Sequence, residues 1–394
     1  MNNIRLIELF AGYGSQAMAL KRAGIPFEHY KVIEFDKYAI KSYNAVHGTN
    51  FPPLDITTIS AQDLDIVDTD KFTYLMTYSF PCTDLSIAGK MQGMSKGSGT
   101  RSGLLWQVER ILNECSELPQ FLLMENVTQV HGKKNKKDFD NWISYLESKG
   151  YTSKWQDLNA NDYGFEQRRN RCFMISYLDK RYNFEFPDPI PLKTCVKDYL
   201  EESVEDKYFL KSKKAQDLID KLSKENIGSY AAIDLSTNNP QIKTIANCIC
   251  ARTDRGISGM RSMGTGVIVK NNSKLIMVGQ MESGKDRTFE SINRVYSPQG
   301  SCPTINTCSG GDRQPKIFDS ESFKIRKLTP LECFRLMGVT DEDAYKMLAA
   351  NSNSQCYKQA GNSIVVDVMT EIFKRLFINQ SDQLKGQMSI FDFI

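Results

Sequence analysis

The sequence predicts an α/β protein with a doubly wound, mostly parallel sheet and a second, smaller domain rich in loops. Three observations predict it. Short apolar runs alternate with helical patterns through residues 1–186, and glycines directly follow the first of these runs. The proline-rich stretch "FPDPIPLK" then separates this part from a segment rich in Gly, Ser, Asn and Arg.

The alternation gives the elements of the first part in order. Strands are expected over residues 4–10, 31–35, 72–76, 121–124 and 172–177. Helices are expected over residues 16–23, 103–115 and 139–149. Beyond the proline-rich stretch we expect one polar helix over 212–224 and then short strands. We therefore divide the chain into a first domain (1–186), a second domain (187–322), a return to the first domain (323–380) and a flexible tail (381–394).

Composition narrows the class of protein. The chain has 394 residues, of which 41% are hydrophobic and 25% charged, as in ordinary globular proteins. Ten cysteines show no disulfide framework, and none of the three histidines stands at zinc spacing from a cysteine. We expect free thiols, no metal, no membrane span and a cytoplasmic location.

Charge alone does not identify a partner. The net charge is only +3, but residues 241–320 hold eleven Lys and Arg against six Asp and Glu. Four further lysines lie close together at 133, 134, 136 and 137. These basic stretches are consistent with a polyanion such as nucleic acid, and equally with a solvated surface.

The first motif is "LFAGYGSQAMAL", in which Gly12 and Gly14 lie between a strand and a helix. Glycines there let the backbone approach a ligand at the carboxyl end of the strand. Glu34, after the second strand, is placed to accept from ribose hydroxyls. This fragment occurs in dehydrogenases, methyltransferases and simple tight turns alike. Ala17 stands where a third glycine would complete a dinucleotide fingerprint.

A second motif, "PCTDLS", places Cys82 after the third strand of the sheet, before a segment rich in glycine and basic residues. An inert buried thiol is the common fate of an intracellular cysteine. The carboxyl end of a parallel strand, however, is where this fold class carries out its chemistry.

Three further motifs follow in order: "LLMENV" with Glu125, "EQRRNRCFMIS" with Arg169 and Arg171, and "QAGNSIVVDV" with Asn362. Each has an ordinary structural explanation, such as a helix cap or a solvated strand edge. Their joint occurrence does not.

Together these motifs resemble the cytosine carbon-5 DNA methyltransferases, over residues 4–178 and 324–378. The resemblance rests on FxGxG, PC with a serine four residues beyond the cysteine, ENV, QxRxR, "RKLTPLECFRLMG" and GNS, all in family order. The stretch "RVYSPQGSCPTINTCSGG" is also similar to the end of family target-recognition domains. Two departures are Thr83, where the family often has Gln, and Asn170, where Glu is common.

The resemblance implies methyl transfer from S-adenosylmethionine to carbon 5 of a flipped cytosine in duplex DNA. Cys82 would be the nucleophile, Glu125 would contact ring nitrogen 3, Arg171 would hold the oxygen at carbon 2, and Arg169 would support a phosphate or orient Glu125. The implied cofactor residues are Phe10, Gly12, Gly14, Glu34, Asp55, Ile56, Leu105, Asn362 and Ile364. The implied DNA contacts are Ser86, Thr304 and Ile305, to which we add Arg252, Arg255 and Arg261 because arginine commonly reads guanine edges.

Three alternatives stay open at this point: an RNA cytosine methyltransferase, a non-catalytic DNA-binding relic, and a Rossmann dehydrogenase, which the missing third glycine disfavours. The sequence leaves open the recognition sequence, the host (bacterium or phage) and any accompanying restriction enzyme. We expect a monomer.

The tail "SDQLKGQMSIFDFI" lies beyond the resemblance. Gln387, Met388, Ser389, Ile390 and Phe391 resemble the short peptide by which bacterial replication and repair proteins bind the DNA sliding clamp. A tail folded back onto the domain, or a frayed one, is the alternative.

Overall fold

The computed structural model describes residues 4–85, 92–165, 167–209, 211, 220, 232–234, 241–243, 265–267, 277–280, 294–298, 300–305, 314–319 and 324–378. Six strands form the central sheet, in the order β2-β1-β3-β4-β7-β5. Their bounds are β1 Ile4–Leu9, β2 Phe27–Ile33, β3 Thr73–Tyr78, β4 Phe121–Val127, β5 Thr152–Asn159 and β7 Asn170–Tyr177. Strands β2, β1, β3 and β4 run parallel, whereas β7 is antiparallel to both β4 and β5. The predicted mostly parallel α/β sheet is confirmed.

Two elements of this region were not predicted from the sequence. Strand β5, "TSKWQDLN", lies at the edge of the sheet and buries only Leu158, so it lacks a run of apolar residues. Helix α2 (Lys37–His47) follows the second strand closely, and Asp36 caps it by accepting from the backbone N–H of Tyr38. Strand β2 also begins four residues earlier than predicted, because an edge strand tolerates charged residues such as Glu28.

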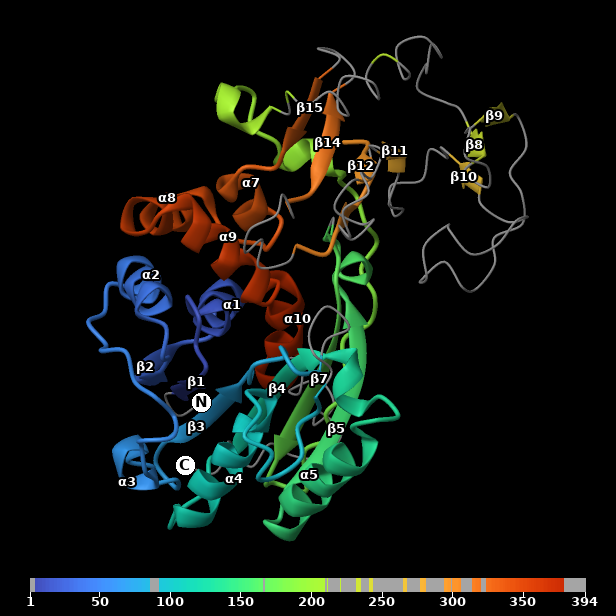
Figure 1. Ribbon diagram of the computed structural model, residues 1–394. Helices are drawn as coiled ribbons and strands as arrows, with labels where there is room; N and C mark the ends of the chain where they lie inside the picture. The colour runs from blue at the N-terminus through green and yellow to red at the C-terminus, as the bar shows by residue number, and fades with distance from the viewer. Residues whose placement is uncertain are drawn as a thin grey trace.

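The sheet is buried on both faces because successive residues of its inner strands enter different cores. Leu6, Leu75 and Leu123 belong to one core and their chain neighbours to the other. Helices α1 (Ser15–Ala23) and α10 (Val366–Phe377) cover the first face, and α4 (Leu105–Glu114) and α5 (Lys136–Ser148) cover the second (Figure 1).

The C-terminal helices pack against the N-terminal ones, as Figure 1 shows. They are α7 Pro330–Arg335, α8 Asp341–Ala350, α9 Asn353–Asn362 and α10. Arg22 of α1 donates to Asp367 of α10 (2.7 Å), and Asn351 beyond α8 donates to the carbonyl of Tyr38 in α2 (3.0 Å). Residues from the two ends of the chain therefore share one core.

The described part of the intervening region contains short strands and two short 3-10 helices, η4 (Val196–Tyr199) and η5 (Asp206–Tyr208). The strands are β8 Ala232–Asp234, β9 Gln241–Lys243, β10 Thr265–Val267, β11 Met277–Gln280, β12 Arg294–Tyr296, β13 Cys302–Pro303, β14 Lys316–Asp319 and β15 Lys324–Lys327. They form the sheets β10-β8-β9 and β11-β12-β14-β15, and β13 pairs with β6 (Gln167–Arg168). The predicted helix over 212–224 falls almost entirely outside the described residues.

The remaining elements are short: α3 Ala61–Leu64, η1 Ser102–Leu104, η2 Thr128–His131 and η3 Ala160–Asp162. Within the described ranges, no helix combines the length and apolar character that a bilayer crossing needs.

Candidate active site

The candidate site follows the edge of the sheet at which β1, β2, β3 and β4 end. Parallel strands bring their carboxyl ends to one edge, which is where ligands bind in such sheets. Strand β7 runs the other way, so its beginning reaches the same edge: Arg171 pairs with Val127, two residues after Glu125. The reversed direction of β7 explains why a motif at the start of a strand joins motifs at the ends of others.

The turn after β1 has a left-handed backbone at Phe10 (φ 60°), Gly12 (58°) and Gly14 (85°). The two glycines serve different purposes. A Cβ at Gly14 would lie 2.4 Å from Nε2 of His47, so Gly14 is needed for close packing. A Cβ at Gly12 would have no atom within 4 Å, so the space beside Gly12 is open to a ligand.

Glu34 lies directly beside this turn. One carboxylate oxygen accepts from the backbone N–H of Gly12 (2.9 Å) and the other from that of Asp36 (2.7 Å). Burial raises the pKa of Glu34, although these two donors act against the shift. The next residue, Phe35, exposes 75% of its surface. Our sequence analysis missed Phe35, although an aromatic residue directly after Glu34 was a visible signal.

The other predicted cofactor residues differ in exposure. Asp55 accepts from the backbone N–H and the hydroxyl of Thr57 (2.9 and 2.8 Å). Asn362 is exposed at the end of α9. Three apolar members of the set are buried in the core: Ile56, Leu105 and Ile364.

Cys82 lies just beyond β3, in a turn held by its neighbours. The carbonyl of Phe80 accepts from the side-chain amide of Asn126 (2.9 Å), which ties the ends of β3 and β4 together. Burial raises the pKa of the Cys82 thiol, and the Glu125 carboxylate adds to the rise. The charges of Arg171 and Arg169 oppose it, as the sequence analysis expected, but burial outweighs them.

Glu125 is buried at the end of β4, and its Oε1 lies 3.3 Å from Nε of Arg171. Burial raises the pKa of Glu125, while the charges of Arg171 and Arg169 counteract the shift. The side chain is therefore disposed to hold a proton beside the thiol.

Arg169 and Arg171 occupy different environments. Arg169 is buried, and its Nη atoms donate to the carbonyls of Ile305 (3.0 Å), Gly361 (3.0 Å) and Ser363 (2.5 Å). Burial, with the charge of Arg171, lowers the pKa of Arg169 to about 9. The guanidinium therefore joins two backbone segments, at residue 305 and at residues 361–363. The role expected for Arg169, to support a phosphate or to orient Glu125, stays a prediction.

The end of the second domain docks beside these arginines. β13 pairs with β6, and the side chain of Gln167 accepts from the backbone N–H of Ile305 (3.2 Å). Ile305 is fully buried, so its side chain packs in the core. Thr304 is exposed, and its hydroxyl donates to the carbonyl of Arg168. The other predicted DNA contacts, at Ser86, Arg252, Arg255 and Arg261, lie outside the described residues.

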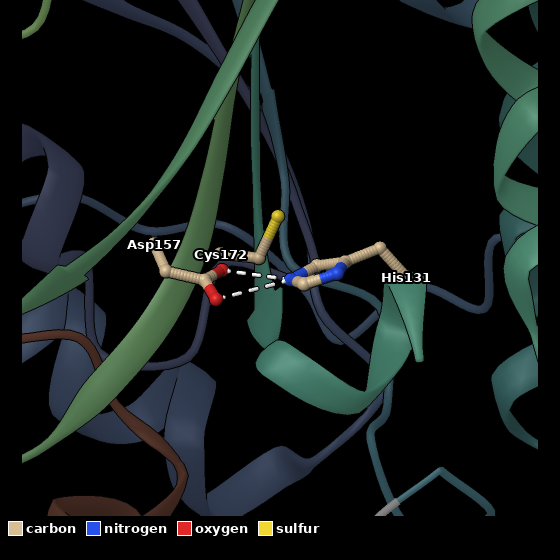
Figure 2. A group of neighbouring side chains, drawn as sticks. All are labelled: His131, Asp157 and Cys172. Atoms are coloured by element: carbon tan, nitrogen blue, oxygen red, sulfur yellow. Dashed lines mark hydrogen bonds and ion pairs between the residues drawn. The ribbon is translucent and has the colours of Figure 1, made fainter. Parts of the chain in front are cut away.

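One cluster of side chains could not be predicted from the spacing of residues in the sequence. Figure 2 shows His131, Asp157 and Cys172, whose candidate ligand atoms lie within 4.8 Å of one another. Nε2 of His131 contacts both carboxylate oxygens of Asp157 (2.9 and 3.1 Å). Burial raises the pKa of the Cys172 thiol. One imidazole, one carboxylate and one thiol at this spacing could together hold a metal ion.

Comparisons with known proteins agree with this geometry. The family model for the C-5 cytosine-specific DNA methylase matches residues 4–378. The chain is 31% identical to the type II methyltransferase M2.ScrFI of Lactococcus lactis subsp. cremoris, over 96% of this chain and all of that protein. It is 28% identical to the orphan methyltransferase M.SssI of Spiroplasma monobiae (95% and 97% covered).

The fold itself has solved counterparts. The structure of the S. pombe Dnmt2 methyltransferase covers 96% of this chain, with a TM-score of 0.62 and 19% identity. A putative DNA modification methyltransferase encoded within an E. coli prophage gives a TM-score of 0.59 at 19% identity. The match to the family model over nearly the whole chain, with Cys82, Glu125 and Arg171 at one sheet edge, places this chain in the C-5 cytosine-specific DNA methylase family as a DNA (cytosine-5-)-methyltransferase.

Proposed function

We propose that this enzyme methylates cytosine within a specific sequence of duplex DNA through a covalent adduct on Cys82. The observation that carries the proposal is the placement of Cys82, Glu125 and Arg171 at the carboxyl edge of the sheet, with Oε1 of Glu125 3.3 Å from Nε of Arg171. Carbon 5 of cytosine is a weak nucleophile, and the base is stacked in the helix. The base must therefore leave the stack, at a cost of a few kcal/mol.

Cys82 then gives its proton to solvent, and its thiolate sulfur forms a bond to carbon 6 of the base while the π bond between carbons 5 and 6 breaks. The addition makes carbon 5 electron-rich and moves negative charge toward ring nitrogen 3. Glu125 carries a raised pKa, so its protonated form can donate to that nitrogen. Arg171 lies beside Glu125 and is assigned to the oxygen at carbon 2. After methylation, carbon 5 loses its proton and Cys82 leaves as thiolate.

The carbonyl of Phe80 is assigned to the exocyclic amine of cytosine. It accepts one hydrogen bond from Asn126, which leaves its second lone pair for the base. Thymine has no amine at this position, so this contact would separate the two bases. Arg169 is assigned a positioning role, because its guanidinium joins the backbone of Ile305, Gly361 and Ser363 beside the site.

S-adenosylmethionine is the methyl donor in this proposal, and it supplies an electrophilic methyl group on its sulfonium. The residues fit such a ligand: Gly12 borders open space, and Glu34 offers a carboxylate to ribose hydroxyls. The exposed ring of Phe35 offers a flat face to an adenine. The other assigned residues are Phe10, Gly14, Asp55, Ile56, Leu105, Asn362 and Ile364.

Bisulfite sequencing of DNA from cells that express the protein tests the proposal. We expect protected cytosines in one short sequence, and none in cells that express Cys82→Ser. An RNA substrate is the second candidate, and methylation of transfer RNA without methylation of duplex DNA would favour it. Unmodified DNA and RNA with a folded protein would support a non-catalytic relic.

Recognition of the DNA target sequence is assigned to residues 187–322. Thr304 is the assigned contact within the described part, because it is exposed beside the active-site arginines. Arg252, Arg255 and Arg261 are assigned to base edges, and Ser86 to the DNA near the nucleophile. Substitution of these arginines should alter site preference or DNA affinity without changing cofactor affinity.

We also propose that residues 387–391 bind a sliding clamp. The enzyme is proposed to be monomeric and to act in the cytoplasm of a bacterial or phage-infected cell. A C-terminal peptide that places Ile390 and Phe391 in a groove of the clamp would raise the local concentration of enzyme on new DNA. Binding of the C-terminal peptide to a bacterial clamp, with Phe391→Ala as control, tests this. Absence of binding at concentrations on the order of tens of micromolar would exclude it.

A further inference from the structure

Two buried side chains, Asp84 and Ser102, connect the beginning and the end of the glycine-rich segment that follows Cys82. Asp84 exposes 6% of its surface and Ser102 none. Oδ2 of Asp84 accepts from the backbone N–H of Arg101 (2.8 Å) and of Ser102 (3.3 Å). In return, the hydroxyl of Ser102 accepts from the backbone N–H of Asp84 (3.2 Å).

The Ser102 hydroxyl also reaches the nucleophile's own peptide bond. It donates to the carbonyl of Pro81 (2.7 Å), which belongs to the peptide unit joining Pro81 to Cys82. The carbonyl before it, of Phe80, accepts from Asn126, and the carbonyl of Cys82 accepts from the backbone N–H of Leu85 (3.0 Å). Three successive carbonyls around the thiol are therefore fixed, and proline restricts φ at the central position.

Hydrogen bonds also connect Gly93, in the described middle of the segment, to Asp84 and to Thr100. The carbonyl of Asp84 accepts from the backbone N–H of Gly93 (3.0 Å), and the hydroxyl of Thr100 donates to the carbonyl of Gly93 (3.1 Å). These bonds are shielded from water at Asp84 and Ser102, where hydrogen bonds are stronger than at the surface.

We propose that Asp84 and Ser102 are positioning residues for Cys82, which hold the Pro81–Cys82 peptide in the orientation that aims the sulfur at carbon 6. The inference rests on the proposed function, since it takes Cys82 as the nucleophile. Attack on the base requires the sulfur within a narrow range of position and direction, and a displacement of about 1 Å can cost about a hundredfold in rate. A peptide unit free to rotate would allow such a displacement.

The test measures how fast the full chain, with S-adenosylmethionine, is trapped on duplex DNA whose cytosines are replaced by 5-fluorocytosine. Cys82 adds to carbon 6 and the methyl group moves to carbon 5, but the fluorine there cannot leave as a proton does, so the adduct persists. We expect Ser102→Ala and Asp84→Ala to slow trapping by about tenfold or more. Asp84→Asn should keep most of the rate, because one amide oxygen can accept from both N–H groups.

Ser98→Ala is the matched control. Its hydroxyl contacts Thr100 (2.9 Å) in the same segment but forms no hydrogen bond to residues 80–85 within the described part of the chain. A readout without DNA or cofactor is the alkylation rate of Cys82 by iodoacetamide, mapped by peptide mass. This rate should change in Ser102→Ala and not in Ser98→Ala, and cofactor affinity should change in neither.

The outcomes separate the two proposals. If the wild-type chain forms no adduct, the proposed function fails. If the wild type is trapped and Ser102→Ala and Asp84→Ala are trapped equally fast, the positioning role is wrong and the proposed function stands. Should Asp84→Ala fail to fold, Ser102→Ala decides alone, because it removes only one hydroxyl group.

Discussion

Two glutamate–arginine pairs differ sharply in how completely the carboxylate is hydrogen bonded. In the first turn of helix α7, Glu332 is fully buried and accepts from Nη1 and Nη2 of Arg326 (2.8 and 2.7 Å). It also accepts from the backbone N–H of Thr329 (2.8 Å) and of Glu201 (2.9 Å). At the edge of the central sheet, Glu125 approaches Arg171 through Nε, at 3.3 Å.

The difference in hydrogen bonding indicates a structural role for Glu332 and is consistent with a reactive role for Glu125. Four short hydrogen bonds to the Glu332 carboxylate fix the start of α7, where Glu332 also completes a capping box with Thr329. The charges of Arg171 and Arg169 do not balance the cost of burying Glu125, and the pKa of Glu125 is raised. The same pair of residue types therefore fixes a helix start in one place and leaves a glutamate with a raised pKa in the other.

The largest effect is expected at the thiol that Glu125 accompanies. Cys82→Ser should abolish turnover, because a serine hydroxyl is a far weaker nucleophile than a thiolate, while S-adenosylmethionine binding stays intact. Methylation of DNA with a labelled methyl donor and calorimetric titration with the cofactor measure the two properties. A variant that methylates at nearly the wild-type rate would remove Cys82 from the mechanism.

Exchange of each carboxylate for an amide tests the comparison directly. Glu125→Gln should lower kcat by about a hundredfold to ten-thousandfold, because it removes the proton donor. Glu332→Gln should instead lower the free energy of unfolding by about 3–5 kcal/mol, because Arg326 loses its buried partner charge. Single-turnover methylation and urea unfolding of both variants measure these changes.

Each variant serves as the control of the other. The comparison would be wrong if Glu125→Gln destabilised the protein as much as Glu332→Gln does, or if folded Glu332→Gln lost the chemical step. A loss of both properties in both variants would show that the two pairs do not have separate roles.

A smaller effect is expected on the pH dependence of the rate. As pH rises through the raised pKa of Glu125, its proton is lost and the rate should fall. As pH rises toward the raised pKa of Cys82, thiolate forms and the rate should climb. Glu125→Gln should therefore keep the rising limb and lose the falling one. Single-turnover rates across the pH range of stable protein check this, and an unchanged falling limb would assign it to another group.

The sequence predicted the motifs of the site better than the roles of individual side chains. Glu125 was predictable because an apolar run ends at it and parallel strands end at one edge. Residues two positions apart on a strand, such as Arg169 and Arg171 would be if both lay in β7, point the same way. Arg169 instead lies between β6 and β7, outside both strands, so the alternation does not apply to it.

Other features depend on contacts between distant segments. Asp84 and Ser102 are eighteen positions apart, and no periodic pattern links them. Asp157 and Cys172 face each other because β5 and β7 pair in a particular register, and β5 was not predicted. Burial of Ile305 likewise follows from the pairing of β13 with β6, which only the folded chain reveals.

The smallest expected effect concerns a third buried glutamate, which has fewer partners than Glu332. Glu8, in β1, accepts from the hydroxyl of Tyr43 (2.5 Å), and its Oε1 has no hydrogen-bond partner among the described residues. Burial raises the pKa of Glu8 to about 8 from an ordinary 4.5. The folded protein thus keeps the proton at pH values where the unfolded chain has lost it.

The sign of the pH effect follows from this difference. Between about pH 4.5 and about pH 8 the folded state binds more protons than the unfolded state, so Glu8 should reduce stability as pH rises across that window. Glu8→Gln keeps an oxygen that can accept from Tyr43 and removes the titration. Its unfolding free energy relative to wild type should therefore rise toward alkaline pH, by up to a few kcal/mol, and level off above about pH 8. Urea unfolding at several pH values measures it, with Glu147→Gln on the exposed face of α5 as the matched control. Parallel pH profiles for Glu8→Gln and wild type would mean that Glu8 is ionised in the folded protein, and burial would then not suffice to hold a proton on a glutamate in this fold.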